Sequence, residues 1–175
     1  MPRSIWSEPL GSFSDALAAT RPAPAGVTVA AVVAELGMCL MIKAMSITGG
    51  HDDLVDTARR EAAELRGAAD QDVGAVIQFI HTRDADTLRQ AIEAPMRAAR
   101  GAVAGLELCA RASVAVKPSL AVDQRAAEAL IAGALRAILM CIDANVRGHE
   151  EAHHDAIAER QALEVRARAT GVYSP

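Results

Sequence analysis

Apolar side chains recur every three or four residues through most of this chain, with polar residues between them. This period is typical of α-helices that share a core, and no stretch carries a strong strand signal. We therefore expect an all-α protein, a helical bundle of about six helices. The predicted helices cover residues 5–19, 28–47, about 52–80, about 85–112, about 121–146 and about 149–168.

The second and fifth predicted helices are apolar nearly all round, which places them at the centre of the bundle. The second is also long enough to suggest a membrane span. Glu35 and Lys43 interrupt it, and two charges within a span are costly in lipid. We therefore interpret it as a core helix and expect no membrane association. It could also pack against its own copy in a dimer.

The composition supports a single helical domain over residues 1–175. Of these residues, 51% are hydrophobic but only 2% aromatic, and small aliphatic side chains allow close helix packing. The net charge of -4 argues against a nucleic-acid-binding protein, which usually carries a basic face. Cys39, Cys109 and Cys141 lie in apolar helical stretches without a C-x-x-C pair, and no secretory leader is evident. These features favour free thiols and a cytoplasmic protein.

A loop containing proline and glycine precedes the second predicted helix. Pro24 requires an extended approach, because proline is not accommodated inside a helix. Gly26 allows backbone or ligand to approach closely, and Thr28 is a candidate N-cap. Free amides at a helix start can bind an anion or a polar ligand. The alternative is an ordinary loop that caps a core helix.

Several polar residues within or beside apolar segments are further candidates. Asp123 opens the fifth predicted helix, as either a cap or an acid–base group at the mouth of a cleft. Asp72 lies near the apolar edge of the third and could pair with an arginine. Lys43 could reach solvent, pair with an acid or line a pocket. Asn145 is expected to satisfy buried hydrogen bonds, and Pro95 to kink its helix or leave a carbonyl free for another partner.

Residues 149–153 match HExxH, in which two histidines share a zinc ion and the glutamate acts as a base. The surrounding segment is dense in charge, and neither a clear third ligand nor a strand to hold a peptide is evident. A metal-dependent hydrolase is therefore the weakest hypothesis. We interpret the segment as a solvated start of the sixth helix and expect no metal.

The order of these features resembles the cyclodeaminase/cyclohydrolase family. That family includes methenyltetrahydrofolate cyclohydrolase and the cyclodeaminase part of formiminotransferase-cyclodeaminase. The resemblance covers about residues 10–147, followed by a charged C-terminal helix and tail over 148–175. The segments that carry it are Phe13 to Leu17, Pro22 to Thr28, Leu36 to Thr48, Asp70 to Val76, Ala91 to Met96, Ser119 to Arg125 and Cys141 to Val146.

The resemblance implies a homodimer that acts on a tetrahydrofolate derivative without a metal. The reactive carbon bridges N5 and N10: a cyclohydrolase adds water there and opens the ring, and a cyclodeaminase closes the ring with loss of ammonia. The resemblance assigns the acid–base role to Asp123, while Asp72 would stabilise the cation or orient water. The substrate-binding residues that it suggests are Pro24, Gly26, Thr28, Lys43, Arg125 and Asn145.

The chain also departs from this family's pattern. The family's triple glycine is reduced to Gly26, and its lysine-rich segment is replaced by His51 and Asp52. Lys43 or Arg125 would then bind the glutamate tail of the folate in place of those lysines. The departures motivate a second hypothesis, in which the chain is a non-catalytic helical binding or scaffold protein.

Overall fold

The computed structural model describes residues 4–174, and over that range it contains six α-helices and three short 3-10 helices. The α-helices are α1 (Leu10–Ala18), α2 (Gly26–Thr48), α3 (Asp52–Thr82), α4 (Ala85–Ser113), α5 (Ala121–Val146) and α6 (His154–Ala169). The 3-10 helices are η1 (Ile5–Ser7), η2 (Pro118–Leu120) and η3 (Glu150–His153). No strand occurs in the described range, and the predicted all-α fold is confirmed.

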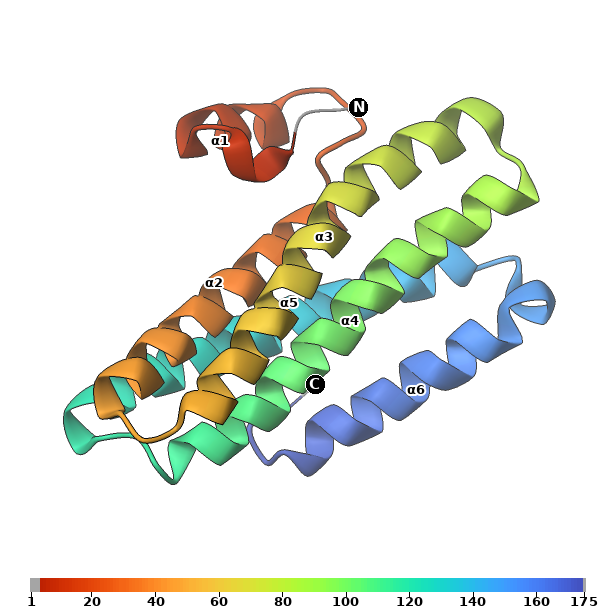
Figure 1. Cartoon of the computed structure of the whole chain (residues 1–175). Coiled ribbons are helices and arrows are strands. Elements are labelled where there is room, and N and C mark those ends of the chain that lie inside the picture. Colours follow the sequence, from red (N-terminus) through yellow and green to blue (C-terminus); the bar gives the residue numbers. More distant parts are fainter. Residues whose placement is uncertain (1–3, 175) are drawn as a thin grey trace.

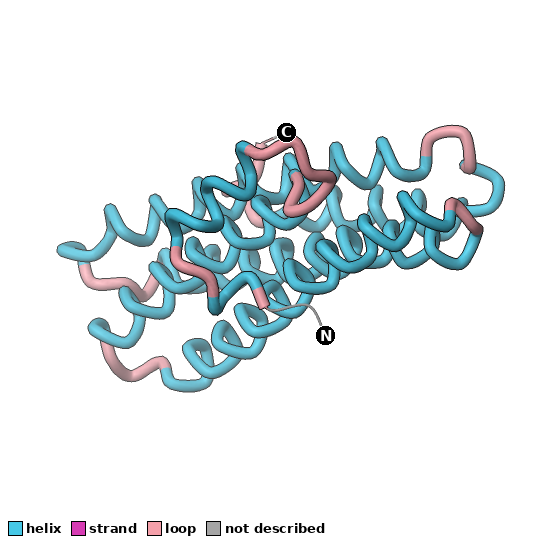
Figure 2. Tube along the Cα trace, turned by 90° about the horizontal axis from the view of Figure 1, so that it is seen from above, coloured by secondary structure: helices cyan, strands magenta, loops and turns pink. Residues whose placement is uncertain are grey.

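Four long helices form the body of the molecule. They pack in the order α2, α3, α4 and α5, and α5 closes the ring against α2. Short connections make neighbouring helices antiparallel (Figure 1), and the loops that join them gather at the two ends of the bundle (Figure 2). The helix α6 lies along the outside of α4, whereas α1 stands apart from the bundle (Figure 1).

The core is built from alanine and flexible or branched aliphatic side chains, as the composition predicted. Its largest fully buried side chains include Met38, Met41, Met45, Met96, Leu106 and Leu135. A glycine brings α2 close to α5. A Cβ atom added at Gly37 would lie 2.8 Å from Ile131 Cγ1 and 3.1 Å from the carbonyl oxygen of Ala127. Any larger residue at this position would push the two central helices apart.

Two helix boundaries in the N-terminal part of the chain differ from those predicted. The expected helix over residues 5–19 is divided into η1 and α1, and Pro9 is the residue from which α1 begins. Proline is compatible with a helix start but not with a helix interior, so the break falls there. The helix α2 begins at Gly26 with Ala25 as its N-cap residue, so Thr28 lies inside the helix and does not cap it.

Two helical segments, Gly26–Thr48 and Pro118–Val146, are long and apolar enough to cross a membrane by length and composition alone. Of their most apolar windows, 56% and 44% respectively are buried inside the fold. The one acidic side chain of α2, Glu35, is 1% exposed and pairs with Arg66 of α3. In this structure α2 is therefore a core helix of the bundle.

The helices α2 and α5 also share an apolar surface on the outside of the bundle. It is formed by Val29, Val33, Leu36 and Leu40 of α2 and by Val122, Leu130, Ala137 and Met140 of α5, all partly or fully exposed. The α2 residues are spaced by three or four positions and the α5 residues by three, seven or eight, so each set lies on one side of its helix. Leu36 is 51% exposed and Met140 67%. This surface, here called the α2/α5 face, is of the kind that contacts another molecule.

Candidate functional site

A buried carboxylate lies between α3 and the start of α2. Asp72 is 1% exposed, and Thr28 is fully buried beside it. Asp72 Oδ2 accepts hydrogen bonds from the backbone N–H of Thr28 at 3.0 Å and from Thr28 Oγ1 at 2.6 Å. No donor from the described part of the chain reaches Asp72 Oδ1. One oxygen is thus fixed by the protein while the other is unengaged.

The environment of Asp72 changes its acidity. Burial raises the pKa of Asp72 above its ordinary value, and the two hydrogen bonds from Thr28 oppose this effect without cancelling it. A carboxyl group of raised pKa keeps its proton to a higher pH than an exposed aspartate does. Such a group is suited to taking up and returning a proton.

The loop before α2 meets the last turns of α5 close to this carboxylate. A Cβ atom added at Gly26 would lie 3.3 Å from Cys141 Sγ, so the glycine leaves room for the thiol. Pro24 is half-buried and follows a cis peptide bond. Burial raises the pKa of the Cys141 thiol, and the charge of Asp72 raises it further. The sequence predicts a free thiol at Cys141 but gives no sign that this side chain lies against Gly26.

Asn145 serves the packing of α5 against α4. Its Nδ2 atom donates a hydrogen bond of 2.9 Å to the carbonyl oxygen of Ala91. That carbonyl lacks its usual intrahelical partner because Pro95, four residues later, has no N–H to donate. The expectation that Pro95 leaves a carbonyl free for another partner is confirmed, and the partner is Asn145.

The other predicted site residues lie together elsewhere. Lys43 Nζ is 3.9 Å from Asp123 Oδ2, and the two side chains are 61% and 41% exposed. Of the alternatives left open for Lys43, the structure thus shows pairing with an acid. Asp123 occupies the first turn of α5, and Arg125 is exposed two residues further along. An ion pair as exposed as this one adds little to stability.

The two groups of residues are at opposite ends of the bundle. The rise of an α-helix separates Thr28 from Lys43 by about 22 Å along α2, and Asp123 from Asn145 by about 33 Å along α5. One copy of the chain therefore does not bring Asp72 and Asp123 into the same site. Proximity of the two aspartates requires a second copy.

The HExxH segment does not present its histidines as one α-helical turn. Residues Glu150–His153 form η3, and His149 precedes it with a φ of -134°. The prediction that the sixth helix begins at about residue 149 is wrong, because α6 begins at His154. Over residues 4–174, no group of three or more His, Cys, Asp or Glu side chains is arranged to hold a metal ion.

Comparisons with known proteins identify the family of this chain and a solved structure of the same fold. The family described as Formiminotransferase-cyclodeaminase matches residues 9–163. The chain belongs to this family. The crystal structure of formiminotetrahydrofolate cyclodeaminase from Thermotoga maritima superimposes with a TM-score of 0.87 at 18% sequence identity, covering 95% of this chain and 93% of that chain. This chain therefore has the fold of that protein. A search of curated protein sequences gives no significant match.

Proposed function

We propose that this protein acts on a tetrahydrofolate derivative, as a methenyltetrahydrofolate cyclohydrolase or a formiminotetrahydrofolate cyclodeaminase does. Membership of the family supports the substrate class. The observation that supports a catalytic role is the environment of Asp72. This buried carboxyl group has a raised pKa, one oxygen held by Thr28 and the other oxygen without a donor from the described residues. This environment favours Asp72 over the exposed Asp123 for proton transfer.

Both reactions move protons around one cationic carbon. In the cyclohydrolase, water adds to the carbon between N5 and N10, a carboxylate takes the proton of that water, and one C–N bond breaks as its nitrogen is protonated. In the cyclodeaminase, N10 attacks the formimino carbon, and the nitrogen that leaves is protonated and departs as ammonia. Asp72 Oδ1 is the atom available to take and return the proton. Thr28 acts as a positioning residue, because both of its donors hold the other oxygen.

We infer that the active unit is a homodimer. The α2/α5 face supplies an apolar surface for a second copy, and closed two-fold pairing is the commonest arrangement of identical chains. Antiparallel pairing through this face would bring the Lys43 and Asp123 end of one copy towards the Asp72 end of the other. Lys43 and Arg125 would then supply positive charge for the carboxylates of a folate tail, and Asp123 would complete the site.

Replacement of the buried carboxyl group tests the proposal. Asp72→Asn should lower kcat/KM for methenyltetrahydrofolate or formiminotetrahydrofolate by at least about 100-fold, because a positioned acid–base group contributes that much or more. A spectrophotometric assay of the methenyl chromophore measures this change for either reaction. Asp56→Asn, an exposed position of the same helix, is the matched control and should retain full activity.

Unchanged activity in Asp72→Asn would reject the assigned role. The loss of the family's glycines and lysines keeps the scaffold hypothesis as a second candidate. Calorimetric measurement of folate binding to the wild-type chain distinguishes the enzyme from the scaffold protein. A scaffold protein neither binds nor converts any reduced folate, whereas an enzyme with a poor assay substrate still binds one.

A further inference from the structure

Residues 4–18, here called the N-terminal arm, are the part of the described chain that is least integrated into the bundle. The arm consists of η1 and α1, and no residue of either helix is buried. Figure 1 shows α1 alongside the N-terminal half of α2 and separated from the other long helices. Leu10, Phe13 and Leu17 lie on one side of α1. Phe13 and Leu17 are half-buried and Leu10 is exposed, so the described residues cover this apolar face only in part.

The root of the arm is nevertheless fixed to α3. Asp70 accepts hydrogen bonds from Ser4 Oγ at 2.7 Å and from the backbone N–H of Ile5 at 2.9 Å. Trp6 Nε1 donates to the carbonyl oxygen of Arg66 at 3.2 Å, and the Arg66 guanidinium lies 5.2 Å from the centre of the Trp6 ring. The arm therefore has a defined place and presents α1 in a set orientation.

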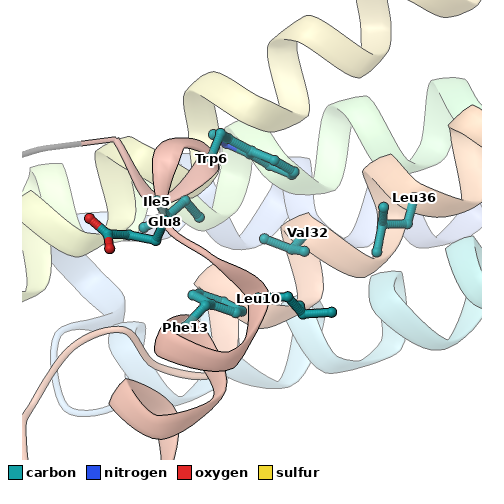
Figure 3. A pocket seen from close by; sticks show the side chains of 7 residues that line it. All are labelled: Ile5, Trp6, Glu8, Leu10, Phe13, Val32 and Leu36. Atoms are coloured by element: carbon teal, nitrogen blue, oxygen red, sulfur yellow. The ribbon is translucent and has the colours of Figure 1, made fainter.

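An apolar groove of about 150 Å³ lies between the arm and α2. The groove is lined on the arm side by Ile5, Trp6, Glu8, Leu10 and Phe13, and on the other side by Val32 and Leu36 of α2 (Figure 3). Leu10 is 79% exposed and Leu36 51%, so the groove opens outward. Leu36 belongs to the α2/α5 face, and the groove thus continues that face beyond the edge of the bundle.

The area of the molecule indicates what occupies this surface. The chain exposes 9138 Å² for a mass of 18.3 kDa. A monomeric globular protein of this mass exposes about 8,100 Å², so the excess is about 1,000 Å². Each partner in a stable interface of standard size buries about 800 Å². The excess is of the size that one copy of a dimer covers.

We propose that the N-terminal arm holds a second copy of this chain, which seats an apolar segment in the groove between α1 and α2. The inference rests on the homodimer of the proposed function and adds α1 as a further element of its interface. The occupant is a second copy because the groove continues the α2/α5 face and the excess area matches one side of a dimer.

The only tryptophan of the chain reports on this contact directly, because Trp6 lines the groove. Its emission should shift to shorter wavelength as the protein concentration rises through the dimerisation range. The double variant Leu10→Ser/Phe13→Ser should weaken self-association, measured by sedimentation velocity, by at least about 10-fold, because it removes two apolar anchors from each arm. Val165→Ser, an exposed apolar position of α6, is the matched control and should associate as the wild type does.

The outcomes separate the arm from the dimer. A dimer whose dissociation constant is unchanged in Leu10→Ser/Phe13→Ser, or whose Trp6 emission is the same in monomer and dimer, overturns the role of the arm and leaves the dimer intact. Met140→Asp in the α2/α5 face should yield monomers with the Trp6 emission of dilute wild type. A wild-type chain that is monomeric at every concentration overturns the inference together with the shared site. None of these measurements uses a folate, so they remain readable if the protein has no folate activity.

Discussion

Asp72 and Asp123 are both helical aspartates, yet their surroundings give them different chemistry. Asp72 is 1% exposed and its pKa is raised by burial, whereas the side chain of Asp123 is 41% exposed and faces Lys43. The hydroxyl and the amide of Thr28 both point at Asp72 Oδ2. Thr28, a predicted N-cap of its own helix, instead orients a carboxyl group on another helix.

The raised pKa of Asp72 predicts a pH-dependent difference in stability between the wild type and Asp72→Asn. A carboxyl group whose pKa is higher in the folded than in the unfolded chain adds stability below its unfolded value, near 4, and this stability is lost as the pH rises through the folded value. Urea unfolding at several pH values should therefore show that the free energy of unfolding of the wild type rises relative to that of Asp72→Asn as the pH falls from neutral. The gain is about 1.4 kcal/mol for each unit by which the pKa is raised.

Comparison with the variant cancels the acid titration of all other carboxylates, which are common to both proteins. Asp56→Asn provides the control, since its difference from the wild type should stay small over this range. A stability difference between Asp72→Asn and the wild type that is constant with pH would show that Asp72 titrates alike in the folded and unfolded chains.

At the scale of helices, one hydrogen bond from α5 compensates for a backbone hydrogen bond that is missing in α4. Pro95 leaves the Ala91 carbonyl without an intrahelical donor, and Asn145 of α5 supplies the missing one. The proline and its partner are 50 residues apart in sequence but form one structural unit. A hydrogen bond of this kind satisfies a buried backbone group that would otherwise be costly to leave unpaired.

A double-mutant cycle tests this unit. Asn145→Ala should lower the free energy of unfolding by about 1–2 kcal/mol, because the Ala91 carbonyl loses its donor. In a Pro95→Ala background the helix regains its own N–H, so the same replacement should cost clearly less. Urea unfolding of the four proteins gives the coupling energy. Equal costs of Asn145→Ala in the two backgrounds would mean that the amide does not compensate for the proline.

Helices were the most predictable level of this structure. The apolar period located α3 and α5 closely, because long amphipathic or apolar segments leave little choice of conformation. Their ends were less predictable where the chain had two acceptable local structures. Pro9 divided one predicted helix, and Glu150–His153 form a 3-10 helix before α6. The partner of Thr28 could not be foreseen, since it depends on how α3 packs against α2 rather than on local sequence.

At the scale of the whole molecule, the site residues identified from sequence form two groups, one around Asp72 and one around Asp123. Sequence order shows that both groups exist, but it does not show which end of the bundle each occupies until the helix directions are known. The antiparallel packing of α2 and α5 places them at opposite ends. A shared site between two copies is the arrangement in which both groups would act together.

Subunit complementation tests the shared site. Asp72→Asn and Asp123→Asn should each be inactive alone. Mixing equal amounts and allowing exchange should restore about one quarter of wild-type activity, because half of the dimers are mixed and each mixed dimer holds one intact site. Asp72→Asn mixed with the Asp72→Asn/Asp123→Asn double variant should remain inactive. Failure of complementation, with exchange verified by mass spectrometry, would place each site within one chain.

The position of Glu35 in α2 matters during synthesis of the chain, before α3 exists. The ribosome completes α2 before α3, so the carboxylate of Glu35 emerges before its partner Arg66 exists. At that stage α2 meets the length and hydropathy of a membrane span. An acidic residue near the centre of such a helix costs roughly 3 kcal/mol to transfer into the bilayer. The buried carboxylate that later pairs with Arg66 therefore biases the nascent helix against insertion until α3 has folded onto it.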